Sequence, residues 1–199
     1  WLWPFATLGW PKENKDLKYF YPTSSLFTAP EIIFFWVARM ILMTGYHLSD
    51  IPFHTVYLHG LVRDGQGRKM SKSIGNIIDP LDMIEKYGAD ATRLSLIIGA
   101  APGNDVKLSE DKVRGYKHFA NKIWNAARFV MSNVESFDTT AKPELTKEDQ
   151  KAIEELETLT QEITKDIEQY RFYLAGEKLY HYFWHSFADV TIERAKPIL

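Results

Sequence analysis

Residues 55–90 read TVYLHGLVRDGQGRKMSKSIGNIIDPLDMIEKYGAD, and this segment carries the main evidence for the architecture of the chain. Its first residues, 55–59, alternate in side-chain character and are rich in β-formers, which predicts a strand that runs into Gly60. Asp79 followed by Pro80 is typical of a helix start. Between them, at the carboxyl end of the strand, lies a lysine-rich loop, and open α/β sheets bind their ligands at this edge. The segment therefore predicts an α/β unit with a ligand-binding loop.

The loop itself reads KMSKS at residues 69–73 and is followed by Gly75 and Asn76. Two ammonium groups, two hydroxyls and a nearby glycine suit a loop that closes over a triphosphate and stabilises charge as bonds rearrange. An ordinary surface turn has a similar composition. The position of the loop after a strand favours phosphate chemistry.

Further motifs accompany this loop: HGLV at 59–62, the run from 79 to 90, FFWVARM at 34–40 and WPFATLGWP at 3–11. Together with the loop they resemble the class I aminoacyl-tRNA synthetases. Within this class the last two motifs are more similar to the valine-specific members than to the isoleucine- or leucine-specific ones. The isoleucine-specific pattern would place Gln and Arg where Ile32 and Phe34 stand.

The resemblance implies an enzyme that activates valine with ATP to valyl-adenylate and transfers the valyl group to tRNA(Val). It implies that Lys69 and Lys72 are the catalytic cations at the departing pyrophosphate, with Lys72 in direct contact. Met70, Ser71 and Ser73 complete the ATP-binding loop, and the two serines are expected to shape it by hydrogen bonds. Mg²⁺ is expected to arrive with ATP, bound through phosphate oxygens.

The resemblance also implies that His59, Gly60 and Val62 lie along the adenine and ribose of ATP, with Gly60 allowing close approach. A strand end whose glycine permits a turn is the alternative. Trp36 is implied as one wall of the amino-acid pocket, although an aromatic residue on an apolar helix also suits a core.

Glu31 has two interpretations. The family usually has Gly and Asp where this chain has Ala29 and Glu31, and that carboxylate is the expected partner of the ATP ribose. Thr28 to Glu31 equally fits a capping box, with Glu31 reaching back to the Thr28 backbone N–H.

The organisation follows from length and periodicity. The 199 residues predict one or two domains. By resemblance, residues 1–103 form the C-terminal half of a Rossmann-like, nucleotide-binding catalytic domain, an α/β fold. Residues 104–199 read as an all-α helical bundle of the tRNA anticodon-binding type. Helix starts are expected at Ser109 and Thr146, and a loop at 138–143.

The first bundle helix is expected to bury a stripe that contains Val113, Tyr116, Ile123, Trp124, Ala127 and Val130. Trp124 either packs in this stripe or stacks on a base. Lys117, Lys122 and Arg128 are candidates for contact with tRNA phosphates, or part of a solvated helix face. The formal net charge of −2 argues against a generally basic, nucleic-acid-coated protein.

Several classes of protein and site are not expected. The chain has no cysteine, which fits a reducing compartment, and we expect a cytoplasmic monomer. The longest apolar run, residues 32–43, is broken by Arg39 and is shorter than the roughly 20 residues of a membrane span, so no membrane partner is expected. His181 and His185 are four apart but lack the adjacent glutamate of catalytic zinc helices, so no protein-bound metal is predicted.

One motif of the class is missing from the sequence. The two-histidine ATP motif of the first half of the nucleotide-binding fold does not occur, so we expect a part of a valine–tRNA ligase that does not activate valine alone. The alternatives are a stand-alone RNA-binding module with a non-catalytic nucleotide loop, or an isoleucyl or leucyl relative.

Overall fold

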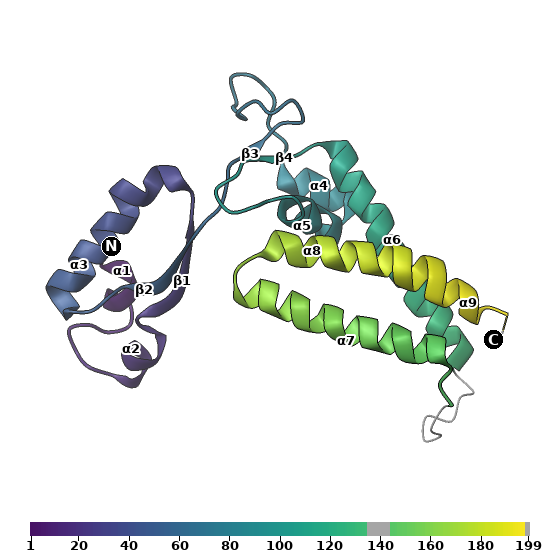
Figure 1. Cartoon of the computed structure of the whole chain (residues 1–199). Coiled ribbons are helices and arrows are strands. Elements are labelled where there is room, and N and C mark those ends of the chain that lie inside the picture. The colour runs from purple at the N-terminus through teal and green to yellow at the C-terminus, as the bar shows by residue number, and fades with distance from the viewer. Residues whose placement is uncertain (135–143, 198–199) are drawn as a thin grey trace. The chain divides into compact units, whose positions relative to one another are not determined.

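The structure is a computed structural model that describes residues 1–134 and 144–197 and divides into two compact units (Figure 1). The first comprises Trp1–Leu61 with Ala101–Asp105, and the second comprises Val62–Ala100 with Val106–Leu199.

The first unit is built around a parallel pair of strands. Its elements are α1 (Trp3–Ala6), α2 (Lys15–Phe20), β1 (Thr23–Thr28), η1 (Pro30–Ile32), η2 (Ile33–Val37), α3 (Ala38–Leu48) and β2 (Phe53–Leu58). The pairing of β1 with β2 runs from Thr23 opposite Phe53 to Thr28 opposite Leu58. Because parallel strands need a crossover, the helical run from η1 to α3 makes this a β–helix–β unit, as the α/β prediction requires.

That helical run is longer and more exposed than the sequence suggested. Pro30–Leu48 spans 19 residues with a mean hydropathy of 1.2, so by length and composition alone it could cross a membrane, although only 11% of it is buried. The expectation of too short an apolar run was wrong because the helix continues past Met43 and includes Arg39. Buried core helices of water-soluble proteins and signal sequences meet the same criteria of length and hydropathy. Within this run, the guanidinium of Arg39 lies 4.8 Å from the ring centre of Trp1.

The second unit is mainly helical. Its elements are β3 (Val62–Arg63), α4 (Pro80–Tyr87), α5 (Ala89–Ile97), β4 (Val106–Lys107), α6 (Glu110–Val134), α7 (Lys147–Glu168), α8 (Phe172–His181), η3 (Tyr182–Ile192) and α9 (Glu193–Ala195). β3 and β4 pair in parallel, and α7 lies beside α8 (Figure 1). The buried cluster Met83, Ala91, Leu108 and Val113 joins α4 and α5 to the start of α6.

The expected helix starts are confirmed. The Asp79 carboxylate accepts a hydrogen bond from the Leu81 N–H at 2.8 Å, and the Ser109 hydroxyl accepts one from the Lys112 N–H at 3.2 Å. Thr146 forms a reciprocal capping box at the start of α7. The predicted loop at 138–143 lies outside the described residues, and the functional boundary at residue 103 stays a prediction.

The expected stripe of α6 is wrong in its second half. Val113 is fully buried, but Trp124 is 67% exposed, and the buried residues beyond the first turns are Phe119 and Ala126. Phe119 packs on aromatic rings of α8 and η3, which rotates the buried face of α6 away from Trp124. Residues Ile123, Trp124 and Ala127 instead line a cavity of about 460 Å³ against α5.

Candidate nucleotide-binding site

The lysine loop is fixed on both sides by apolar contacts. Met70, its second residue, and Ile78, five residues after it, pack against the buried cluster of the second unit. The loop between them therefore leaves a hydrophobic core and returns to it within a few residues. Met70 has a packing role in this structure, and its contact with ATP stays a prediction.

A buried carboxylate, Asp64, lies beside the loop and is only 6% exposed. Its Oδ1 accepts hydrogen bonds from the backbone N–H groups of Gln66, at 3.0 Å, and Arg68, at 2.8 Å. Its Oδ2 accepts from Arg68 Nε at 2.8 Å and from Asn76 Nδ2 at 2.9 Å. The hydrogen bond from Asn76, together with those from Arg68, lowers the pKa of the Asp64 carboxyl despite the opposing effect of burial.

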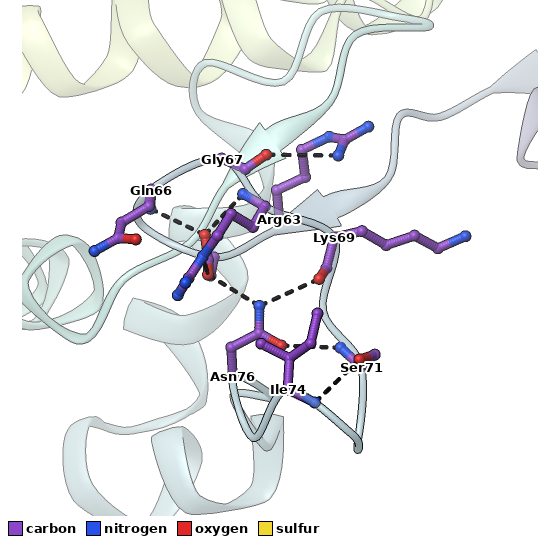
Figure 2. Close-up of polar contacts among 9 residues, drawn as sticks. Arg63, Gln66, Gly67, Lys69, Ser71, Ile74 and Asn76 are labelled. Atoms are coloured by element: carbon purple, nitrogen blue, oxygen red, sulfur yellow. Dashed lines mark hydrogen bonds and ion pairs between the residues drawn. The ribbon is translucent and has the colours of Figure 1, made fainter.

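Asn76 extends this network to the backbone of the loop (Figure 2). Its Nδ2 also donates to the carbonyl of Lys69 at 3.2 Å, and its Oδ1 accepts from the N–H of Ser71 at 2.9 Å. Inside the loop, the hydroxyls of Ser71 and Ser73 lie 3.0 Å apart, and Ser71 Oγ accepts from the N–H of Ile74 at 3.3 Å. The serines thus hydrogen-bond within the loop as predicted, while their contact with ATP stays a prediction.

The two lysines of the loop differ from its neighbouring arginine. Among the described residues, neither the Lys69 nor the Lys72 ammonium has a hydrogen-bond or ion-pair partner, and both side chains are exposed. Figure 2 shows the Lys69 side chain extending away from the network. Arg68 instead forms an ion pair with Asp64. Two positive charges are therefore presented to solvent from a fixed loop.

Gly60, two residues after the end of β2, lies where the chain leaves no space for a side chain. A Cβ built on Gly60 would overlap the carbonyl of Asn104 and lie 2.7 Å from the backbone nitrogen of Asp105. The backbone of Asn104 and Asp105 therefore approaches Gly60 closely, and the contact of Gly60 with a nucleotide stays a prediction. The adjacent His59 is exposed, and its Nδ1 lies 3.0 Å from the Gly60 carbonyl.

Glu31 does not form the predicted capping box. It is exposed in η1, whose N-cap is Ala29, without a side-chain cap. Thr28 is the last residue of β1, buried and paired with Leu58 of β2, so its backbone belongs to the sheet. This leaves the Glu31 carboxylate available to a ligand. Trp36, in η2, is 49% exposed.

The predicted ATP and amino-acid residues thus fall into two sets. Glu31, Trp36, His59 and Gly60 belong to the first unit, with Trp36 5.9 Å from the ring of Trp1. Val62, in β3 and 40% exposed, belongs to the second unit with the whole KMSKS loop. The structure brings the members of the loop together within the second unit.

Two of the three basic candidates on α6 already have partners. Lys117 Nζ donates to the carbonyl of Lys86 at 3.1 Å. Lys122 Nζ pairs with Asp189 at 2.6 Å and lies 4.3 Å from the ring centre of Trp184. Arg128, in contrast, is exposed, and its guanidinium has no hydrogen-bond or ion-pair partner in the described part of the chain.

No group of three or more His, Cys, Asp or Glu that could hold a metal occurs among the described residues. The rings of His181 and His185 are 5.7 Å apart, and His185 lies 3.7 Å from Asp189.

Comparison with known proteins decides the family. A model described as "tRNA synthetases class I (I, L, M and V)" matches residues 1–109, which is more than half of the chain. The chain belongs to the class I tRNA synthetases. A second model, "Anticodon-binding domain of tRNA ligase", matches residues 149–199.

Similar curated members of the class are valine–tRNA ligases. The chain is 48% identical over 201 residues to that of Clostridium acetobutylicum, and 51% identical over 206 residues to that of Bdellovibrio bacteriovorus. Both matches cover 100% of this chain and 23% of the relative. The ligase of Aquifex aeolicus is 51% identical over 198 residues, which cover 98% of this chain and 17% of the relative. The chain therefore spans less than a quarter of the length of these ligases and is similar to one part of them.

Solved class I synthetases share the fold. Mycobacterium tuberculosis methionyl-tRNA synthetase in complex with methionyl-adenylate matches with a TM-score of 0.71 and 24% identity, over 86% of this chain and 35% of that one. The ternary complex of Agrobacterium radiobacter K84 agnB2 LeuRS with tRNA and LeuAMS matches with a TM-score of 0.67 and 21% identity, over 81% and 23%. These matches agree with a fold that mixes helices and strands.

Sequence reasoning missed Asp64, beside the loop, and assigned no separate role to Asn76, three residues after it. Asp64 was not singled out, although the Asp64-Gly65 turn, with Arg68 four residues on, was a signal for a local carboxylate contact. Asn76 was noted only as part of the motif. Its bonds to residues 5, 7 and 12 positions away could not be read from periodicity.

Proposed function

We propose that this chain is the part of a valine–tRNA ligase that supplies the pyrophosphate-binding loop and part of the tRNA-binding helical region. The observation that carries the proposal is the pair of exposed ammonium groups, Lys69 and Lys72, on a loop anchored in the core at both ends. The high identity to valine–tRNA ligases supports valine as the amino acid.

In the complete ligase, the carboxylate of valine attacks the α-phosphorus of ATP. A carboxylate oxygen–phosphorus bond forms, the bond to the bridging oxygen breaks, and pyrophosphate leaves with the electron pair. A terminal ribose hydroxyl of tRNA(Val) then takes the valyl group and releases AMP. Mg²⁺ accompanies ATP as part of the substrate.

The lysines would act on the departing pyrophosphate. Negative charge grows there as the bond breaks, and a cation placed at that position stabilises the transition state more than the ground state. Lys72 is assigned the direct contact and Lys69 a supporting field. His59, Gly60, Val62 and Glu31 are proposed along the nucleoside of ATP.

The architecture proposed for the complete ligase divides at residue 103. Residues 1–103 would belong to the later half of a Rossmann-like catalytic domain, and 104–199 to a helical domain that contacts tRNA. The exposed apolar run Pro30–Leu48 supports the proposal that this chain packs against further parts of the ligase, because an apolar surface of this size is usually covered. The remainder of a ligase more than four times as long would supply that cover. The proposed location is the cytoplasm, where tRNA is charged.

Valine-dependent exchange of pyrophosphate into ATP tests the assignment in the full-length ligase that contains this sequence. Lys72→Ala should lower the exchange rate by about 100-fold, equivalent to about 3 kcal/mol of transition-state stabilisation. Lys165→Ala, an exposed lysine on α7, is the matched control and should leave the rate within about twofold of the original. Unchanged exchange in the Lys72 variant would exclude its role.

The 199-residue chain alone should show no exchange. Tight, salt-sensitive tRNA binding by this chain, with full exchange activity in the Lys72 variant of the ligase, would instead favour an RNA-binding module with a non-catalytic loop.

A further inference from the structure

We infer that Asp64 and Asn76 are positioning residues of the synthetase reaction, which hold the backbone of the KMSKS loop in the one arrangement that presents Lys69 and Lys72 to pyrophosphate. This inference rests on the proposed function. Neither residue is expected to touch the substrate, because their polar atoms are directed at the loop and its adjoining turn.

Asp64 supplies the fixed end of the connection. It follows β3 directly, and its backbone exchanges two hydrogen bonds with the adjoining turn, from its own N–H to the Arg68 carbonyl at 3.0 Å and from the Gly67 N–H to its carbonyl at 2.8 Å. Its carboxylate then accepts from two backbone N–H groups of the same turn. A buried carboxylate with this many donors is held in one orientation, so its remaining oxygen is a defined anchor for Asn76.

Asn76 supplies the link from that anchor to the loop. Its amide nitrogen donates to Asp64 Oδ2 and to the Lys69 carbonyl, while its amide oxygen accepts from the Ser71 N–H. These three partners fix which end of the amide is oxygen and which is nitrogen, because two are acceptors and one is a donor. The carbonyl of Lys69 and the N–H of Ser71 enclose Met70, so both lysines flank the point that Asn76 holds.

Only an amide of this size satisfies all three partners. Asn76→Asp keeps the acceptor for Ser71 but places a second carboxylate against Asp64 and an oxygen against the Lys69 carbonyl. Asn76→Ala removes all three bonds, yet leaves the apolar anchor Met70 and both lysines in place. The alanine variant therefore isolates positioning from charge.

The first measurement follows the loop itself. Hydrogen exchange in the full-length ligase should accelerate at least about tenfold in peptides covering 69–76 when Asn76 becomes Ala, because the Ser71 N–H loses its acceptor. Trypsin should also cleave faster after Lys69 and Lys72. Asn125→Ala, an exposed asparagine on α6, is the matched control and should change neither result.

The second measurement follows the reaction. Asn76→Ala should lower kcat of valine-dependent pyrophosphate exchange about tenfold, with KM for valine within about twofold, since the charges remain but are no longer held in place. Asn76→Asp should lower kcat further than Asn76→Ala does. The double variant Asp64→Asn/Asn76→Ala should lower kcat no more than the worse of the two single variants does, because both residues act through one link.

The outcomes separate cleanly. Unchanged loop exchange in the Asn76→Ala variant would overturn the inference, and so would faster loop exchange with unchanged kcat, or fully additive losses in the double variant. Should Asp64→Asn fail to fold, Asn76→Ala alone decides. Absence of valine-dependent exchange in the original ligase would overturn the proposed function instead, while the hydrogen-exchange comparison would still report on the link.

Discussion

Replacing Gly60 by alanine should destabilise the first unit by about 3 kcal/mol. The new Cβ would overlap the Asn104 carbonyl and lie 2.7 Å from the Asp105 nitrogen. These atoms belong to backbone, which cannot rotate away as the end of a side chain can. Overpacking of this kind costs about 1–3 kcal/mol.

The displaced segment also carries two hydrogen bonds that hold it to β2 and its continuation. The Gly103 N–H donates to the Leu58 carbonyl at 2.9 Å, and the Leu61 N–H donates to Asp105 Oδ1 at 2.9 Å. Loss of each would add about 1 kcal/mol. The total effect is therefore expected at or above the upper limit for overpacking alone.

Gly45→Ala is the matched control, because it makes the same chemical change in the same unit. Nothing lies within 4 Å of a Cβ at Gly45, which is in the interior of α3. Alanine is favoured over glycine in a helix interior by up to about 1 kcal/mol. This variant should therefore be as stable as the original chain or more stable.

Urea unfolding of the 199-residue chain, followed by tryptophan fluorescence, measures both variants. Hydrogen exchange at the amides of Leu61 and Gly103 localises the effect, and both amides should exchange faster in the Gly60 variant. An unfolding free energy within about 0.5 kcal/mol of the original, with both amides still protected, would refute the steric reasoning.

Two further predictions concern the second unit. In Gly176→Ala the new Cβ would lie 2.8 Å from Ile98 Cγ1, a side-chain atom that can shift. The free energy of unfolding should therefore fall by about 1 kcal/mol, with a modest fall in melting temperature. Gly115→Ala, with nothing within 4 Å of its new Cβ, should not lower the melting temperature. The pKa of the Asp166 carboxyl is lowered from 3.8, and the largest cause is the hydrogen bond from Lys178. The stabilisation of the fold by the ionised carboxylate is therefore present above pH 3.8 and is lost as the pH falls through the lower pKa of the folded state. Asp166→Asn should therefore flatten the acid end of the stability curve, measured by urea midpoints between about pH 6 and about pH 3; an unchanged acid slope would contradict this.

The sequence predicted features that depend on a few adjacent residues. A side-chain oxygen caps the start of α4, α6 and α7 because Asp79, Ser109 and Thr146 lie within three residues of the N–H groups that they accept from. Strand β2 was recognised in part, since β-branched and aromatic residues are concentrated there.

Features set by distant partners were not predictable in this way. Trp124 shares the helical period of the α6 stripe, but the aromatic rings that define the buried face come from residues 180–184. Gly60 meets a segment more than 40 residues away. The capping box at Thr28 satisfied a local rule, and the parallel sheet overrode it.

The candidate site combines both situations. The composition of the loop indicated phosphate chemistry, yet it did not distinguish the basic side chains by role. Arg68 is committed to Asp64, so its charge stabilises the turn, whereas Lys69 and Lys72 have no such partner among the described residues. A loop with all its cations paired would bind phosphate weakly, and a loop with none paired would repel itself. Pairing one arginine with a buried carboxylate, and linking that carboxylate to the loop through an amide, leaves two positive charges for a ligand without leaving the backbone free.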